Sequence, residues 1–199
     1  MARPAPTARL ALVATTLLVA AAPSVRAQTA MPAAPPQDNE ASRAAKLRAM
    51  VILKMAPYFS LEAAPATRAT EFRIGVVGDD AVVQSLRSDV AGKKVNELPV
   101  VIVGIDPKDA ASGKLAAKYD VLYLACSVDE PSRKAIIASH ADKPTPLVAE
   151  QTGFAQSGGA VQLFVKDNTV RFEINAEALK KQGVRASPQL LKLSRKGPT

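Results

Sequence analysis

Residues 98–105, LPVVIVGI, and residues 120–125, DVLYLA, are the two stretches that decide the fold. Each is an almost uninterrupted apolar run, without the alternation typical of a strand that has one face in water. Both runs therefore predict strands that are buried on both faces, as in the centre of a parallel sheet.

The segments around these runs alternate between strands and helices. Residues 71–77 predict a strand, and Asp80 is placed to cap the helix that follows. Asp129 is placed to cap a helix after the second apolar run, and residues 146–150 predict a short strand beyond that helix. This alternation predicts a largely parallel sheet with helices on its faces.

The pattern changes near the C-terminus. Residues 161–166 and 170–174 predict two strands, and Asp167-Asn168 between them predicts a hairpin turn. Asn175 and Ser187 are each placed to cap a short helix. The predicted fold class is therefore α/β, with a mostly parallel central sheet flanked by helices and closed by a C-terminal antiparallel β-hairpin and two short helices.

The N-terminal residues predict export. Residues 1–27 combine early arginines, the uncharged apolar run 10–22 and a small-x-small site, which are typical of a cleaved secretory signal peptide. An uncleaved N-terminal anchor is the alternative. Residues 28–41 are rich in Ala, Pro and polar groups and predict a disordered leader. Residues 42–199 then form a single domain, which we expect in the periplasm.

The first helix of the domain is predicted to start after Ser42, which can cap it, and to end before Pro57. Its apolar positions cover most of its circumference. We therefore expect the domain or a partner to cover this helix.

The charge of the chain argues against nucleic-acid binding. The formal charge of +8 falls to +5 once Arg3, Arg9 and Arg26 leave with the signal peptide. The remaining basic residues are spread along the chain, and the sequence has no Trp that could stack on a base.

Cys126 is the single cysteine of the chain, so it has no internal disulfide partner. Because it ends the apolar run VLYLAC, we expect it to be a small buried side chain. A disulfide to another chain stays open as the alternative.

The ionisable residues do not form a recognisable catalytic, cofactor or metal motif. Gly75 and Gly78 lack the spacing of a dinucleotide fingerprint. The pair Asp79-Asp80 is similar to the acidic pair of phosphoacceptor receiver domains, but the Asp and Lys that complete such a site have no counterparts. His140 is the only histidine, which argues against a zinc site or a histidine-based hydrolase. We therefore expect no enzymatic activity and no cofactor.

Arg171 and Glu173 are the candidate site residues. In a strand they project from one face about 7 Å apart. One carboxylate without a second acid, a metal or a histidine is a poor catalytic set, and Asn175 beside it is already placed as a cap. This polar face is predicted to be scaffold or a contact surface for a partner protein.

Ordered segments over most of residues 70–195 resemble the YfiR family of periplasmic proteins. The resemblance covers FRIGVVGDD at 72–80, GKKVNELPVVI at 92–102, YDVLYLACS at 119–127, and the segment 152–195 with its Gly158-Gly159 pair and hairpin. The first helix departs from the family pattern because it is rich in Met and lacks a Trp. Some family members hold cysteine pairs, whereas this chain has only Cys126.

The resemblance implies a non-enzymatic periplasmic regulator. Its partner would be a membrane-bound signalling protein, such as a diguanylate cyclase or a sensor kinase, which it contacts through the partner's periplasmic domain. Repression of a cyclase in this way lowers cyclic-di-GMP in the cell. The resemblance also implies a homodimer.

Two alternatives remain from the residues themselves. The first is a periplasmic small-ligand binding protein, with its pocket at the strand carboxyl ends near Gly78-Asp79 and Ser127. The second is an exported hydrolase that uses Glu173 with Arg171.

Overall fold

The computed structural model describes residues 40–61, 70–112, 119–167 and 169–195 of the chain. The predicted signal peptide and residues 28–39 of the predicted leader lie outside the described residues. These two assignments stay predictions.

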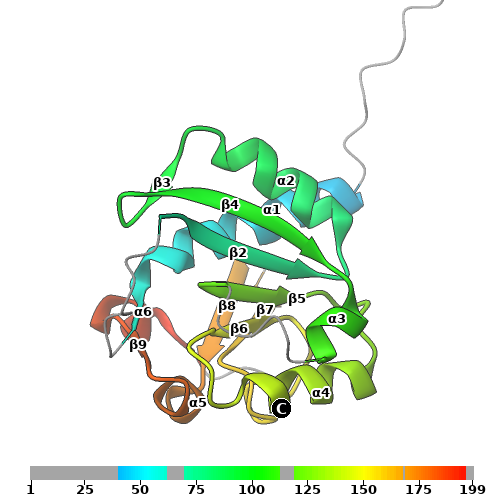
Figure 1. The fold of residues 1–199 in the computed structure, drawn as a ribbon, viewed down its shortest axis with the longest axis vertical. Helices are drawn as coiled ribbons and strands as arrows, with labels where there is room; N and C mark the ends of the chain where they lie inside the picture. The colour runs from blue at the N-terminus through cyan, green and yellow to red at the C-terminus, as the bar shows by residue number, and fades with distance from the viewer. Residues whose placement is uncertain (1–39, 62–69, 113–118, 168, 196–199) are drawn as a thin grey trace, which may run out of the picture. The chain divides into compact units, whose positions relative to one another are not determined.

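A seven-stranded sheet is the centre of the described structure, in the order β3-β4-β2-β5-β6-β7-β8 (Figure 1). Strands β4, β2, β5, β6 and β7 run parallel, and antiparallel strands β3 and β8 form the two edges. The predicted fold class is confirmed. The strands span β2 (Phe72–Val77), β3 (Lys94–Val95), β4 (Leu98–Ile105), β5 (Val121–Leu124), β6 (Leu147–Ala149), β7 (Val161–Lys166) and β8 (Thr169–Ile174).

Helices cover both faces of this sheet. Side chains of α1 and α2 pack into one apolar cluster, and those of α3 and α4 into a second. Strand β5 supplies both clusters, because Tyr123 points into the first and its neighbours Leu122 and Leu124 into the second. The helices span α1 (Glu40–Met55), α2 (Asp80–Val90), α3 (Pro107–Ala111), α4 (Glu130–His140), α5 (Ala176–Lys181) and α6 (Pro188–Leu193).

A smaller two-stranded sheet lies outside the main one. The short helix η1 (Ala56–Tyr58) follows α1 directly and leads into β1 (Phe59–Leu61). Strand β1 pairs antiparallel with β9 (Val184–Ala186), which precedes α6. This pairing joins the N-terminal and C-terminal parts of the described chain.

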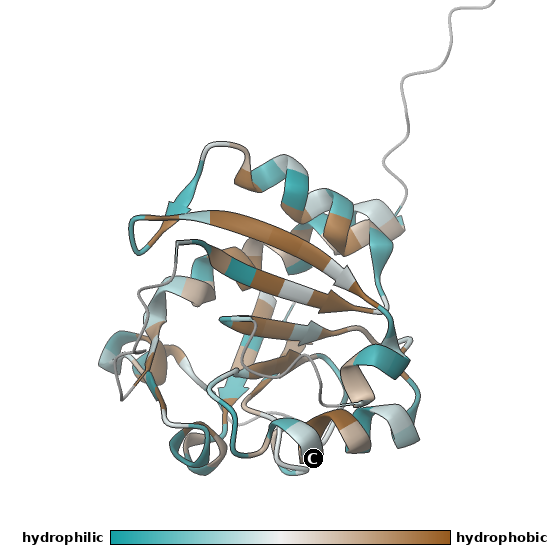
Figure 2. Ribbon diagram, viewed as in Figure 1, coloured by the Kyte–Doolittle hydropathy of each residue, from teal (hydrophilic) through white to brown (hydrophobic). Residues whose placement is uncertain are grey.

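The two apolar runs differ in burial. All four residues of β5 are buried, as predicted, and Figure 2 shows the apolar character of the central strands. The same prediction for residues 98–105 is wrong, because only Ile102 and Ile105 of β4 are buried. Beyond β4 lies only the two-residue strand β3, so this side of the sheet keeps an open edge. The apolar run did not distinguish a central strand from its outer neighbour.

Most of the predicted caps are confirmed. Side-chain oxygens of Asp129, Asn175 and Ser187 accept hydrogen bonds from the first turns of α4, α5 and α6. The cap of α2 is Asp79 instead of Asp80, since its carboxylate accepts from Val82 N at 3.0 Å. Two adjacent aspartates cannot be told apart by local sequence, because either could end the preceding strand.

The boundaries of two other elements can be compared with the sequence. Helix α1 begins at Glu40, two residues before the predicted cap Ser42. The hairpin has the predicted turn, with Lys166 opposite Thr169. Asp167 has a φ of 52°, as a two-residue turn between twisted strands requires.

Candidate functional site

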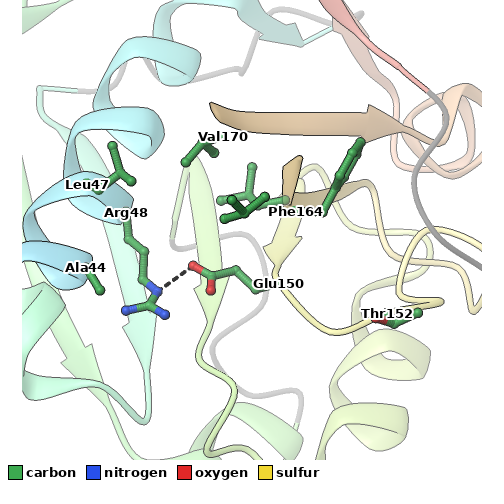
Figure 3. A pocket seen from close by; sticks show the side chains of 9 residues that line it. Ala44, Leu47, Arg48, Glu150, Thr152, Phe164 and Val170 are labelled. Carbon is green, nitrogen blue, oxygen red and sulfur yellow. Dashed lines mark hydrogen bonds and ion pairs between the residues drawn. The ribbon is translucent and has the colours of Figure 1, made fainter. Parts of the chain in front are cut away.

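A cavity of ≈ 330 Å³ lies between α1 and the β7–β8 hairpin (Figure 3). We call it the α1–hairpin groove. Its walls are mostly apolar, and its floor carries the charged side chains of Arg48 and Glu150. The lining residues are Ala44, Leu47, Arg48, Glu150, Thr152, Leu163, Phe164, Val165 and Val170.

The sequence of α1 explains why one wall of the groove is open. The helix buries Ala45, Ala49 and Ile52, and the small alanines allow its backbone to approach the core. Leu47 and Met50 lie on the other side and are 45% and 47% exposed. The domain therefore covers only one side of α1, although the apolar pattern predicted cover around most of it.

The floor of the groove is a hydrogen-bonded cluster around one carboxylate. Arg48 Nε donates to Glu150 Oε1 at 2.5 Å, and Tyr123 Oη donates to the same oxygen at 3.1 Å (Figure 3 for the ion pair). The hydrogen bond to Glu150 raises the pKa of Arg48, and burial raises that of Tyr123. Glu150 thus joins the first helix to the central strand.

Cys126 lies at the edge of this cluster and is exposed, which corrects the expectation of a buried side chain. Strand β5 ends at Leu124, so the chain has already turned away from the core when it reaches Cys126. Its Sγ lies 4.0 Å from Glu150 Oε2. Partial burial, and then the charge of Glu150, raises the pKa of the Cys126 thiol.

Alkylation of Cys126 by iodoacetamide should therefore begin at higher pH than alkylation of an unperturbed thiol. Glu150→Gln is expected to lower the midpoint of the rate-against-pH curve, because it removes a nearby negative charge and leaves Arg48 unneutralised. Mass spectrometry of timed reactions measures this rate. Glu130→Gln on α4 is the control and should leave the midpoint unchanged; equal midpoints in all three proteins would contradict the prediction.

Arg171 and Glu173 lie outside the groove. Both are half-buried on β8, and Glu173 accepts hydrogen bonds from Gln156 Nε2 at 3.3 Å. Strand alternation turns them away from α1, because their neighbour Phe172 packs with the α1 side of the core. The structure thus places the two predicted contact residues on one face and Arg48 with Glu150 on another.

The other ionisable residues weighed in the sequence have separate local roles. Asp79 caps α2. His140 is fully buried in the last turn of α4, where its Nδ1 lies 2.9 Å from Ile136 O, and burial lowers its pKa. Within the described ranges, no three His, Cys, Asp or Glu residues are grouped so that they could hold a metal ion.

The expected small-ligand position at the strand ends is closed on the Ser127 side and hollow on the side of β4. Ser127 Oγ donates to Gly78 O at 2.6 Å, so the loops after β5 and β2 touch each other. The hollow has a volume of ≈ 390 Å³, and Gly78 and Asp80 line it together with Gly104 and Pro107. It therefore includes part of the predicted position, and small-ligand binding there stays a prediction. In the part of the chain that the structure describes, no helix has the length and apolar character needed to cross a bilayer.

Comparison with known proteins identifies the family. The sequence profile described as YfiR/HmsC-like matches residues 45–195, which include the sheet, most of α1 and the hairpin.

Two solved structures share the fold. The ABC domain in complex with L-Trp from Streptococcus pneumonia has a TM-score of 0.50 and 12% identity; the match covers 75% of this chain and 59% of that one. A conserved domain protein from Vibrio cholerae has a TM-score of 0.52 and 16% identity, over 75% and 58% of the two chains. The chain spans less than two thirds of either protein, and at these identities the likeness concerns the fold alone. It is the profile match over residues 45–195 that makes this chain a member of the YfiR/HmsC-like family.

Proposed function

We propose that this chain is a periplasmic, non-enzymatic regulator that binds a membrane-anchored signalling protein through that protein's periplasmic domain. The observation that carries the proposal is the family match over residues 45–195. The YfiR/HmsC-like family is associated with periplasmic control of cyclic-di-GMP signalling, so the partner proposed first is a diguanylate cyclase and the second a sensor kinase. The mature chain acts in the periplasm after removal of its signal peptide.

A regulator of this kind works by preferential binding. A domain shifts a two-state partner only by as much as it prefers one state over the other. Raising the population of the preferred state of the partner from about 1% to about 99% requires about a 10⁴-fold preference in affinity, or about 5.5 kcal/mol. Such a difference is within reach of one well-packed protein interface.

Two surfaces of this chain are proposed to take part. The first is the face of β8 with Arg171 and Glu173, where a partner would meet a cation and an anion in fixed positions. The second is a homodimer contact between two copies of the chain. The first proposal rests on the polar face of the strand, and the second rests on the family resemblance.

Deletion of the gene tests the function. We expect the cyclic-di-GMP content of the cell to rise several-fold and to return to its original level when the full chain is supplied. A matched control supplies the chain without residues 1–27, which stays in the cytoplasm and should not restore the level. Cross-linked membranes should then yield a cyclase with the captured chain. An unchanged cyclic-di-GMP content would remove the cyclase as partner, and recovery of neither a cyclase nor a kinase would reject the proposed function.

A small-ligand binding function is the second candidate, and the α1–hairpin groove favours it. Its volume of ≈ 330 Å³ is at the lower end of the range of ligand pockets, about 300–1,000 Å³. A rise of several degrees in the melting temperature with one compound from a metabolite panel would support this function. An unchanged melting temperature with every compound would argue against small-ligand binding, and the regulatory function would remain as the candidate.

A further inference from the structure

The solvent side of α1 forms a continuous arc of basic and apolar side chains. Because α-helices turn 100° per residue, positions 43, 47, 50 and 54 recur on one side of the helix, opposite the buried alanines. The basic and apolar side chains on this side of the helix are all exposed, and α1 carries no acidic residue between positions 43 and 54. We call this surface the α1 arc; it consists of Arg43, Lys46, Leu47, Met50 and Lys54.

The tip of the β7–β8 hairpin extends the α1 arc. Val165 is 69% exposed and lines the same groove as Leu47, so the two side chains share one side of the domain. Lys166 follows it and is also exposed. One acid, Asp167, lies in the turn. The combined surface therefore has apolar side chains at its centre and an excess of cations around them.

We propose that the α1 arc and the hairpin tip dock on an anionic lipid surface. Apolar side chains that project beside Lys and Arg enter the headgroup boundary, while the cations meet the lipid charges. Each basic residue near such a surface contributes about 1 kcal/mol to the attraction. The formal charge of +5 that is expected to remain after the signal peptide is removed adds a long-range attraction. Charge complementarity selects this occupant, because the arc offers three cations and no anion between Arg43 and Lys54.

This inference goes beyond the proposed function. It concerns where the chain resides, and it holds whether the regulated partner is a cyclase or a kinase. A regulator held on the membrane has a higher effective concentration near a membrane-anchored partner, which strengthens a weak contact without any new interaction.

Vesicle flotation with the exported, purified chain tests the inference. The probes are vesicles of phosphatidylcholine alone and vesicles of equal parts phosphatidylcholine and phosphatidylglycerol. We expect the chain to float with the second kind only, and to be released by added salt. Arg43→Gln with Lys54→Gln should weaken binding about 30-fold, since each cation contributes about 1 kcal/mol.

The matched control removes the same charge from a distant place. Lys180 and Lys181 are exposed on α5, which lies at the opposite end of the view from α1 (Figure 1). Lys180→Gln with Lys181→Gln should weaken binding less than threefold. A loss equal to that of the Arg43 and Lys54 variant would show attraction by net charge alone and overturn the inference.

A second variant tests the apolar part. Leu47→Ser with Met50→Ser keeps every charge and should weaken vesicle binding at least tenfold, because two side chains no longer enter the boundary. Both side chains are about half exposed, so the fold should persist, and circular dichroism checks this. A chain that floats with neither vesicle would overturn the inference. If that chain forms a dimer that this variant dissociates, the surface belongs to a second copy instead.

Discussion

Gly159→Ala is expected to lower the free energy of unfolding by about 3 kcal/mol. A Cβ atom at this position would overlap three ring carbons of Phe154, a side chain that is only 1% exposed. Retreat of the backbone is opposed by the hydrogen bond from Gly159 N to Phe154 O at 3.0 Å. Equilibrium unfolding in urea measures the loss.

Gly104→Ala is the control for this experiment. Its added Cβ would lie 3.4 Å from Val83 Cγ2, which is an ordinary van der Waals contact. We expect its effect on the free energy of unfolding to stay within about 1 kcal/mol. Equal losses in the two variants would mean that the loop carrying Phe154 relaxes freely, and the close packing described for it would then be wrong.

Arg48→Met is expected to lower the free energy of unfolding by about 2 kcal/mol. The change leaves the carboxylate of Glu150, whose side chain is 20% exposed, without its cation beside the buried Tyr123. The partial exposure of the pair makes this loss smaller than that of a fully buried ion pair. Unfolding in urea at neutral pH is again the measurement.

The chain offers a matched control in the ion pair Lys134–Glu130. Both side chains are more than 60% exposed, and the pair spans one turn of α4. Lys134→Met should therefore change the free energy of unfolding by no more than about 0.5 kcal/mol. In addition, Arg48→Met combined with Glu150→Leu should recover part of the loss, since it removes the stranded charge. A double variant that is less stable than Arg48→Met would contradict the stated cause.

The parts of the fold that depend on nearby residues could be predicted from the sequence. The caps Asp129, Asn175 and Ser187 act within one helical turn, and the hairpin turn at Asp167 joins strands that are adjacent in the chain. The alternation of strands and helices also indicated the parallel sheet, because parallel neighbours need a crossover between them.

The errors arose where burial depends on position in the sheet. An apolar run predicts a buried strand, yet most residues of β4 are partly exposed because this strand lies next to the two-residue edge strand. Cys126 follows the apolar strand in sequence but belongs to the turn after it. A single chain pattern does not say which strands will be central.

The candidate site also contains residues that the sequence pattern indicated and residues that it did not indicate. Arg171 and Glu173 were visible as an alternating polar face, whereas the pair of Arg48 and Glu150 was not visible at all. These two residues are 102 positions apart, and no local spacing connects them. The available signal was weak: one Arg on the buried side of an apolar helix, and one Glu after a buried strand.

Sequence alone therefore determined the class of fold, the family resemblance and the order of the main helices and strands, because these follow from local patterns along the chain. The short strands β1, β3 and β9 were not predicted from the sequence. Tertiary structure alone decided which side of α1 is open, that Cys126 faces solvent and that Glu150 joins the first helix to the central strand. The physical reason is that exposure and ion pairing depend on which distant segments come together, and only the packing of α1 on the sheet brings these together.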